Sequence, residues 1–235
     1  MDLSSQLAWL ESTLLAQVST PFPDPWNKDE KAAIAAYLVL THACIEEALE
    51  DAFSRRLDRL IEMVEDGTQV PIALARLGLD AGLQLPEKSR VPYRKRHLKG
   101  TLKAFAEYYR RSVILMNHGI KAENLEKMAS GAGVDWEEFE ASLTEALADL
   151  STLGAKRGSV GHLSPFTEKS AVITSRVDLS DIRSWVEAAQ NAVGAVEAAL
   201  AKDLPRIQEQ TVPAQAKGGH SQALTPDIGT APWSS

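Results

Sequence analysis

Cysteine is almost absent from this sequence, because Cys44 is the only one among 235 residues. A single cysteine excludes an intrachain disulfide, argues against a cysteine-based metal site and indicates a reducing compartment. No apolar run approaches the ~20 residues that span a bilayer, and residues 1–17 lack the basic segment that begins a signal peptide. We therefore expect a cytoplasmic protein that has no membrane partner.

Motifs for metals and nucleotides are missing as well. None of the five histidines pairs with another at a spacing of three or four, and there is no His-Glu-x-x-His or Asp-rich calcium loop. The glycines at 131 and 133, and at 158 and 161, form neither a GxGxxG nor a Walker loop. We therefore expect no bound metal and no cofactor.

Positive charge is scarce overall but concentrated in one stretch. The formal net charge is −7, yet nine Lys or Arg residues stand against two Glu between Glu87 and Arg111. A basic stripe on an acidic body attracts a polyanion at one place and repels it elsewhere. The charge pattern is therefore compatible with a polyanionic partner at this stretch.

The spacing of apolar residues predicts helices along most of the chain. The expected helices cover residues 3–18, 28–65, 94–116, 121–133, 135–154 and 178–204. Asn27 and Asp135 are the expected N-caps of the second and fifth of these, while Gly67 and Gly154 are their expected ends. Residues 70–93 predict a short helix with loops, and the β-branched stretch 169–178 predicts an extended segment or hairpin arm.

These patterns indicate an all-α fold, a bundle of about five to seven helices. We expect an N-terminal helix with a proline-rich linker over residues 1–26 and a helical domain over residues 27–204. Residues 205–235 are rich in Pro, Gly, Gln, Ser and Thr, so we expect a disordered tail there.

The stretch LGAKRGSVGHLSPF, residues 153–166, carries a candidate pair of polar side chains, Arg157 and His162. Two further pairs fit a slightly longer spacing, so spacing alone is not specific: Arg90 with His97, and Arg111 with His118. Residues five apart on an α-helix differ by about 140° around its axis, so a shared site requires a local turn or a second subunit. The alternative is a loop arginine in a salt bridge and a histidine that caps the next helix.

Three stretches resemble the HEPN superfamily (higher eukaryotes and prokaryotes nucleotide-binding), an all-α fold with an Arg-x4–6-His motif. AKRGSVGH is similar to that motif, and NHGIKAENLEKM, residues 117–128, is similar to the segment before it in bacterial RiboL-PSP-HEPN proteins and their close siblings. YLVLTHACIEEALEDAF, residues 37–53, resembles the long early helix whose acidic residue faces the motif. Glu46 is the first choice for that acidic residue and Glu50 the second. The resemblance covers roughly residues 28–202, and it implies a HEPN-like bundle with one or two accessory helices.

The resemblance implies a metal-independent endoribonuclease that works as a homodimer, with two Arg/His motifs facing each other across a cleft. His162 would be the general acid or base, Arg157 would bind the scissile phosphate, and Glu46 would orient one of them. Attack by the 2′-OH of RNA would leave a 2′,3′-cyclic phosphate. The same resemblance implies a toxin–antitoxin or phage-defence setting, in which an antitoxin or defence protein is a further partner.

Two positions depart from the family pattern. Gly158 stands where many HEPN ribonucleases have Asn directly after the motif arginine, which puts in doubt any role of that amide. Ser164 stands where toxins modified by a partner nucleotidyltransferase carry Tyr, so we expect no control of that kind.

Basic side chains before the motif are the expected guides for the RNA backbone: Arg94, Lys95, Arg96, Lys99 and Lys103. Tyr93 and Tyr108 offer faces on which bases stack. The alternative for this stretch is a solvated helix face paired with the acids of residues 135–149. Asn117 and His118 are expected beside the cleft as supporting polar groups, or alternatively as a polar helix end before Gly119.

Two other functions stay open at this point. One is a non-catalytic HEPN module that binds RNA, a nucleotide or a protein partner. The other is a dimeric helical interaction module in which Arg157 and His162 are structural.

Overall fold

The computed structural model describes residues 2–19, 26–65, 98–161 and 177–202, all within the unit Met1–Pro205. Every element among them is helical, which confirms the predicted all-α fold. The helices are α1 (Leu3–Leu10), α2 (Lys28–Glu65), α4 (Leu98–Tyr109), α5 (Ala122–Gly131), α6 (Trp136–Ser142), α7 (Thr144–Gly161) and α8 (Leu179–Lys202). Two π-helical turns, Glu11–Leu15 and Arg110–Ile114, extend α1 and α4.

Several expectations fall outside the described residues. These are the elements over residues 70–93, most of the stretch 169–178, the helix end at Gly67 and the tail after Pro205.

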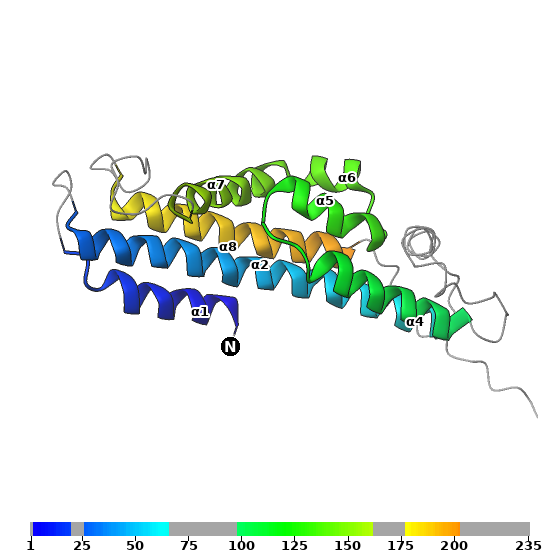
Figure 1. The fold of residues 1–235 in the computed structure, drawn as a ribbon. Helices are drawn as coiled ribbons and strands as arrows, with labels where there is room; N and C mark the ends of the chain where they lie inside the picture. Colours follow the sequence, from blue (N-terminus) through cyan, green and yellow to red (C-terminus); the bar gives the residue numbers. More distant parts are fainter. Residues whose placement is uncertain (1, 20–25, 66–97, 162–176, 203–235) are drawn as a thin grey trace, which may run out of the picture. The chain divides into compact units, whose positions relative to one another are not determined.

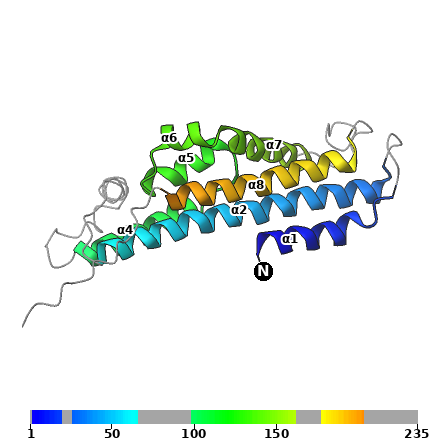
Figure 2. The same cartoon turned by 180° about the vertical axis from the view of Figure 1, so that it is seen from behind.

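Helix α2 is the central element, and it packs against α1, α4, α5, α7 and α8. Figures 1 and 2 show α1 along one side of its first half and α8 along another side, with α7 lying over α8. The largest fully buried side chains of α2 recur every three or four residues, as expected of a core-facing stripe. They are Ile34, Tyr37, Leu38, Ile45, Leu49, Phe53, Leu57, Leu60 and Met63.

By length and composition alone, the α2 segment Lys28–Met63 is long and apolar enough to cross a membrane. Half of its most apolar window is buried inside the unit. Glu30, His42 and Arg56 are also among its buried residues. An interior helix of a bundle meets the same criterion, because it is apolar around much of its circumference.

The start of α2 is fixed by a capping box. Asn27 Oδ1 accepts hydrogen bonds from the backbone N–H groups of Asp29 and Glu30, both at 2.9 Å. Glu30 Oε2 accepts one from Asn27 N at 2.9 Å, and its Oε1 accepts another from Ser19 N at 2.9 Å. These bonds satisfy the N–H groups that lack helical partners at a helix start. The predicted N-cap is confirmed, and Glu30 also ties the segment after α1 to α2.

The single helix predicted for residues 135–154 was wrong, because the chain leaves helical geometry at Leu143 (φ −124°, ψ 20°). Asp135 caps α6 as predicted, accepting a bond from Glu138 N at 3.4 Å. At the break, the hydroxyls of Ser142 and Thr144 donate to the carbonyls of Phe139 and Glu140. Such local bonds compete with the helical pattern, and they separate α6 from α7.

The predicted helix end at Gly154 was also wrong, because α7 continues to Gly161. A Cβ atom at Gly154 would lie 3.3 Å from Lys121 Cγ and 3.5 Å from Ile120 Cγ1. The glycine therefore makes room for a neighbouring segment, and packing offsets the ~1 kcal/mol that glycine costs inside a helix. Arg157 consequently lies on a helix and not in a loop.

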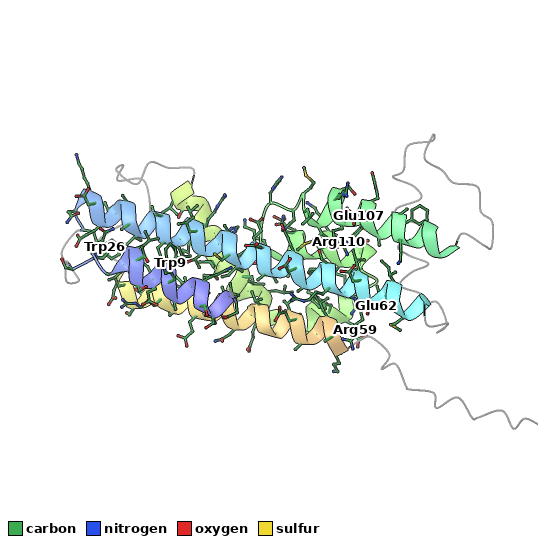
Figure 3. The ribbon with its side chains drawn as sticks, turned by 90° about the horizontal axis from the view of Figure 1, so that it is seen from below. Trp9, Trp26, Arg59, Glu62, Glu107 and Arg110 are labelled. Atoms are coloured by element: carbon green, nitrogen blue, oxygen red, sulfur yellow. The ribbon has the colours of Figure 1, made fainter. Side chains whose placement is uncertain are left out.

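Helix α4 is attached to α2 by charge. Arg110, in the π-helical turn after α4, pairs with Asp58 of α2 and donates to Glu107 of α4 at 3.1 Å. Figure 3 shows Glu107 and Arg110 next to the half of α2 that carries Arg59 and Glu62.

A buried arginine on α2 holds the ends of two other helices. Arg56 is 4% exposed. Its Nε donates to Ala132 O at 2.9 Å and its Nη1 to Leu200 O at 2.6 Å, with a longer contact of 3.4 Å from Nη2 to Gly133 O. Gly133 has a positive φ of 67°, as is typical of the residue that ends a helix. Arg56 thus supplies donors to carbonyls at the ends of both α5 and α8.

We expect Arg56→Met to lower the free energy of unfolding by about 2–4 kcal/mol, because it leaves these buried carbonyls without donors. The neighbouring Arg55 is the matched control, since its side chain is 62% exposed and pairs with Glu197 at 2.6 Å. Arg55→Met should cost less than about 1 kcal/mol. Urea unfolding of both variants measures the difference, and equal losses would contradict a special role for Arg56.

Candidate functional site

Three polar side chains, His42, Glu46 and Glu50, stand four residues apart on α2. Four residues are about one helical turn, so the three form a stripe on one face, called the polar stripe below. His42 is 5% exposed, and the two glutamates are half-buried. His42 Nδ1 lies 3.9 Å from Glu46 Oε2. An apolar core helix therefore carries one polar strip along its middle.

Arg157 of α7 acts on this polar stripe. Its charge interacts with both His42 and Glu46. Among the described residues, its buried Nε atom has no hydrogen-bond partner. In the described part of the chain, Arg157 forms no ion pair. Arginine binds an anion such as a phosphate with a fork of N–H groups, so this side chain suits such a ligand.

Burial removes the charge of His42. Its desolvation, and then the nearby charge of Arg157, lower the pKa of His42 to about 4. The imidazole is therefore neutral at pH 7, and the contact with Glu46 is not an ion pair under those conditions.

Glu46 is held between opposing effects. Burial raises the pKa of Glu46, while the charges of Arg157 and His118 act in the opposite direction. Its buried Oε1 has no hydrogen-bond partner among the residues that the structure describes. Glu46 thus interacts electrostatically with α7, through Arg157, and with the residues before α5, through His118.

Glu50 extends the stripe into a cluster of acids. Burial, followed by the charges of Glu46, Asp51 and Glu47, raises the pKa of Glu50 to about 7, although a hydrogen bond from Asn117 opposes the rise. Near neutral pH this side chain therefore exists in both protonated and charged forms.

The segment between the π-helical turn and α5, residues 115–121, is called the α4–α5 corner. Asn117 bridges the corner and the stripe, because it bonds Glu50 and its Nδ2 also donates to Gly119 O at 2.7 Å. His118 is exposed and interacts with Glu46. The corner reaches this position because Gly154 has no side chain to keep Ile120 and Lys121 away from α7.

The structure thus brings Arg157 together with Glu46, Glu50, Asn117 and His118, which the sequence had singled out. Other predicted site residues cannot be placed beside them. His162 directly follows the last residue of α7 and lies outside the described residues, as do Arg94, Lys95 and Arg96. Lys99 belongs to α4, but its side chain is not described, and Lys103 is exposed on α4.

The structure describes ion pairs for two residues at the end of the basic stretch, Arg110 and Arg111. Arg110 pairs with Asp58 and Glu107, and Arg111 Nε lies 2.6 Å from Glu107 Oε1. These acids belong to α2 and α4, whereas the alternative interpretation of this stretch expected acids from residues 135–149. Arg110 therefore links the end of α4 to α2, while Arg111 forms an ion pair with a residue of α4.

Sequence reasoning missed His42. It was one of five histidines and was dismissed because no second histidine stands three or four residues away. The signal was its spacing from acids, since His42, Glu46 and Glu50 repeat every four residues along one face of the helix. A periodic polar stripe on a core helix indicates a site more specifically than pairs of like residues do.

The arrangement supports anion binding and proton transfer. It offers one arginine that forms no ion pair with the described residues, carboxyl groups with raised pKa values, a neutral buried imidazole and an exposed histidine. Within the described residues, no group of three His, Cys, Asp or Glu side chains is placed to hold a metal ion.

Comparison with known proteins gives one match. The family model described as RiboL-PSP-HEPN matches residues 5–201, which include the polar stripe, the α4–α5 corner and Arg157. No curated protein and no solved structure matches the chain.

Glu50→Gln should change how stability depends on pH. The folded-state pKa of Glu50, about 7, lies above its ordinary value of 4.5, so the folded chain binds this proton more tightly and stability falls as pH rises between these values. Gln removes that fall and can still accept the bond from Asn117. We expect Glu50→Gln to be more stable than the parent by roughly 1 kcal/mol at pH 8, allowing for solvent screening, and equal to it near pH 4.

Urea unfolding at both pH values measures this difference. Glu187→Gln, at an exposed position of α8, is the control and should show the same difference at both pH values. A Glu50→Gln protein whose stability relative to the parent does not change with pH would contradict the assignment.

Proposed function

We propose that this chain, which belongs to the RiboL-PSP-HEPN family, is a metal-independent endoribonuclease. The observation that carries the proposal is the guanidinium of Arg157, which interacts with a partly protonated acidic stripe while its buried Nε has no hydrogen-bond partner among the described residues. HEPN domains often have ribonuclease activity. A cation beside proton-accepting groups is the chemistry that cleavage of RNA requires.

The proposed reaction uses the nucleophile that RNA itself carries. A base removes the proton of the 2′-OH, and the 2′-oxygen forms a bond to the adjacent phosphorus. The bond from phosphorus to the 5′-oxygen breaks, and an acid protonates that oxygen. The products are a 2′,3′-cyclic phosphate and a 5′-OH end.

We assign these roles to the motif residues. His162 is the acid or base, since histidine titrates near neutrality. Arg157 binds the phosphate and stabilises the charge that grows on its oxygens. Glu46 interacts with Arg157 and orients it.

We further propose that the active form is a homodimer, because one chain supplies only one motif histidine and the reaction needs both an acid and a base. Exposed apolar residues beside the site support this. Leu115 and Met116, in the α4–α5 corner, are 53% and 60% exposed. Large exposed apolar side chains that gather near a site favour an interface there.

The setting is proposed from the resemblance alone. A cytoplasmic toxin or phage-defence nuclease, with an antitoxin or defence protein as partner and RNA as substrate, is the setting in which such an activity is expected.

A non-catalytic RNA-binding module is the second candidate, and Gly158 favours it. Many HEPN ribonucleases resemble each other in having Asn at this position. A Cβ atom at Gly158 would have no atom within 4 Å, so the place of such a side chain is open.

RNA cleavage tests the proposal directly. The parent protein should cleave RNA in EDTA and leave 2′,3′-cyclic phosphate ends, and His162→Ala should not cleave above background. Arg157→Lys keeps the charge but loses the fork of N–H groups, so we expect cleavage to fall about 100-fold. Arg183→Lys, an exposed arginine of α8 that pairs with Glu11, should cleave like the parent.

Cleavage that EDTA abolishes would contradict the metal-independent mechanism, and equal cleavage by His162→Ala would contradict the assignment of the site. Binding of RNA by the parent without any cleavage would instead support the second candidate.

Gly158→Asn separates the two candidates further. In an active nuclease that works without this amide, we expect cleavage to change less than about tenfold. A gain of about 100-fold is the effect of one added transition-state donor, and it would show that glycine costs catalysis at this position. Gly194→Asn on α8 is the matched control, because a Cβ atom there also has no atom within 4 Å.

A further inference from the structure

A groove adjoins the candidate site between α4 with its π-helical turn and α5. Its volume is about 560 Å³, within the range of pockets that hold small ligands. Val113 and Met116 line it with apolar surface, Asn117 and Asn124 with amides, and His118 and Lys127 with basic groups. We call it the α4–α5 groove.

The charge of this groove differs from that of a second large groove. No Asp or Glu is among the described residues that line the α4–α5 groove, although the chain has 32 acids and a net charge of −7. A groove of similar size, about 630 Å³, between α1, α2 and α8 is lined by Asp2, Glu47, Asp51 and Glu197. A third, of only about 160 Å³, is lined by Arg55, Arg56, Arg59 and Glu197. The α4–α5 groove is thus a large groove whose described lining has basic residues and no carboxylate, and this favours an anionic ligand.

The α4–α5 groove and the candidate site share two residues. Asn117 lines the groove and bonds Glu50, and His118 lines the groove and interacts with Glu46. A ligand in the groove therefore lies one side chain away from the polar stripe on which Arg157 acts.

The walls of the groove are held at a fixed separation. The hydroxyl of Tyr109, at the end of α4, donates to Lys127 O and accepts from Gly131 N at 2.8 Å, and both of these belong to α5. A Cβ atom at Gly131 would lie 2.2 Å from Tyr109 Cε2, so the ring needs glycine there. The groove is consequently formed before any ligand binds, which lowers the entropy that binding costs.

We propose that the α4–α5 groove holds the base of a nucleotide next to the scissile bond of single-stranded RNA and so sets the base preference of cleavage. The flat base lies against Val113 and Met116, its edge meets the amides of Asn117 and Asn124, and its phosphate lies near His118 and Lys127. This inference rests on the proposed function, because it assigns a nucleotide position to the same site.

The test fills the groove with a bulky side chain. Ser112 is exposed and lines the α4–α5 groove, while Ser4 is exposed and lines the acidic groove. Full-length Ser112→Trp and the matched control Ser4→Trp are compared on RNA oligonucleotides in which the base on each side of the cleaved bond is varied. We expect the parent and Ser4→Trp to prefer one base by about tenfold or more in kcat/KM, and Ser112→Trp to show less than about threefold preference.

Lys127→Ala is a second variant that adds no bulk. Lys127→Ala should raise KM for RNA about fivefold and leave kcat unchanged, whereas Lys28→Ala, at the start of α2, should change neither. Circular dichroism melting shows whether each variant folds. A base preference that survives in a folded Ser112→Trp protein would overturn the inference.

Binding separates failure of this inference from failure of the proposed function. Fluorescence anisotropy measures the affinity of the same oligonucleotides for His162→Ala proteins with and without Ser112→Trp. Absence of cleavage by the parent, together with base-selective binding that Ser112→Trp removes, would overturn the nuclease and support the groove. Cleavage and binding that are equal with and without Ser112→Trp would support the nuclease and leave the groove for a protein partner, which overturns the inference.

Discussion

The buried guanidinium of Arg56 is the contact on which the geometry of this bundle most depends. A charge at 4% exposure has a large desolvation cost, which is offset here by carbonyl oxygens at the ends of α5 and α8 that lack helical partners. Both helices are thereby fixed relative to α2. Because α5 begins at the α4–α5 corner, the position of Asn117 and His118 over the polar stripe depends on a contact at the opposite end of that helix. Arg56 thus fixes two helices relative to α2, and Arg157 of α7 interacts with the polar stripe of the same helix.

Burial also decides which groups of the site are charged. The pKa of His42 is lowered to about 4, so its imidazole is neutral at pH 7, while the raised pKa of Glu50 keeps a proton on part of that acidic cluster. Arginine keeps its charge in either environment. The net charge of the site is therefore less negative than its residue types suggest. A phosphate ligand is repelled less than it would be by two fully charged glutamates. A protonated carboxyl group is also a hydrogen-bond donor. Glu50 can therefore donate to a phosphate oxygen only in its protonated form, which the charges of the neighbouring acids favour.

The sequence predicts those features that local chemistry controls. The long helix Lys28–Glu65 was predicted with its capping residue because Asn27, Glu30 and the apolar period are all local. The course of α7 was not predicted, because Gly154 is a helix terminator by local preference and a packing residue only when Lys121 is brought against it. The break at Leu143 depends on whether the hydroxyls of Ser142 and Thr144 donate to backbone carbonyls or to water. Glu46 was found through a family resemblance, whereas His42 required knowledge of which face of α2 meets Arg157.

For an acidic protein that acts on a polyanion, the positions of its charges matter more than its net charge. Around the groove between α1, α2 and α8, carboxylates repel a phosphate backbone, while the α4–α5 groove has basic residues and no carboxylate. In the proposed function, repulsion at the first groove disfavours unproductive binding of RNA, and attraction at the α4–α5 groove favours the proposed position of the nucleotide. Because these charges are exposed, their effect weakens within a Debye length of about 8 Å at physiological salt. In the proposed function, selection by charge therefore acts only on nucleotides that lie within about this distance of the α4–α5 groove.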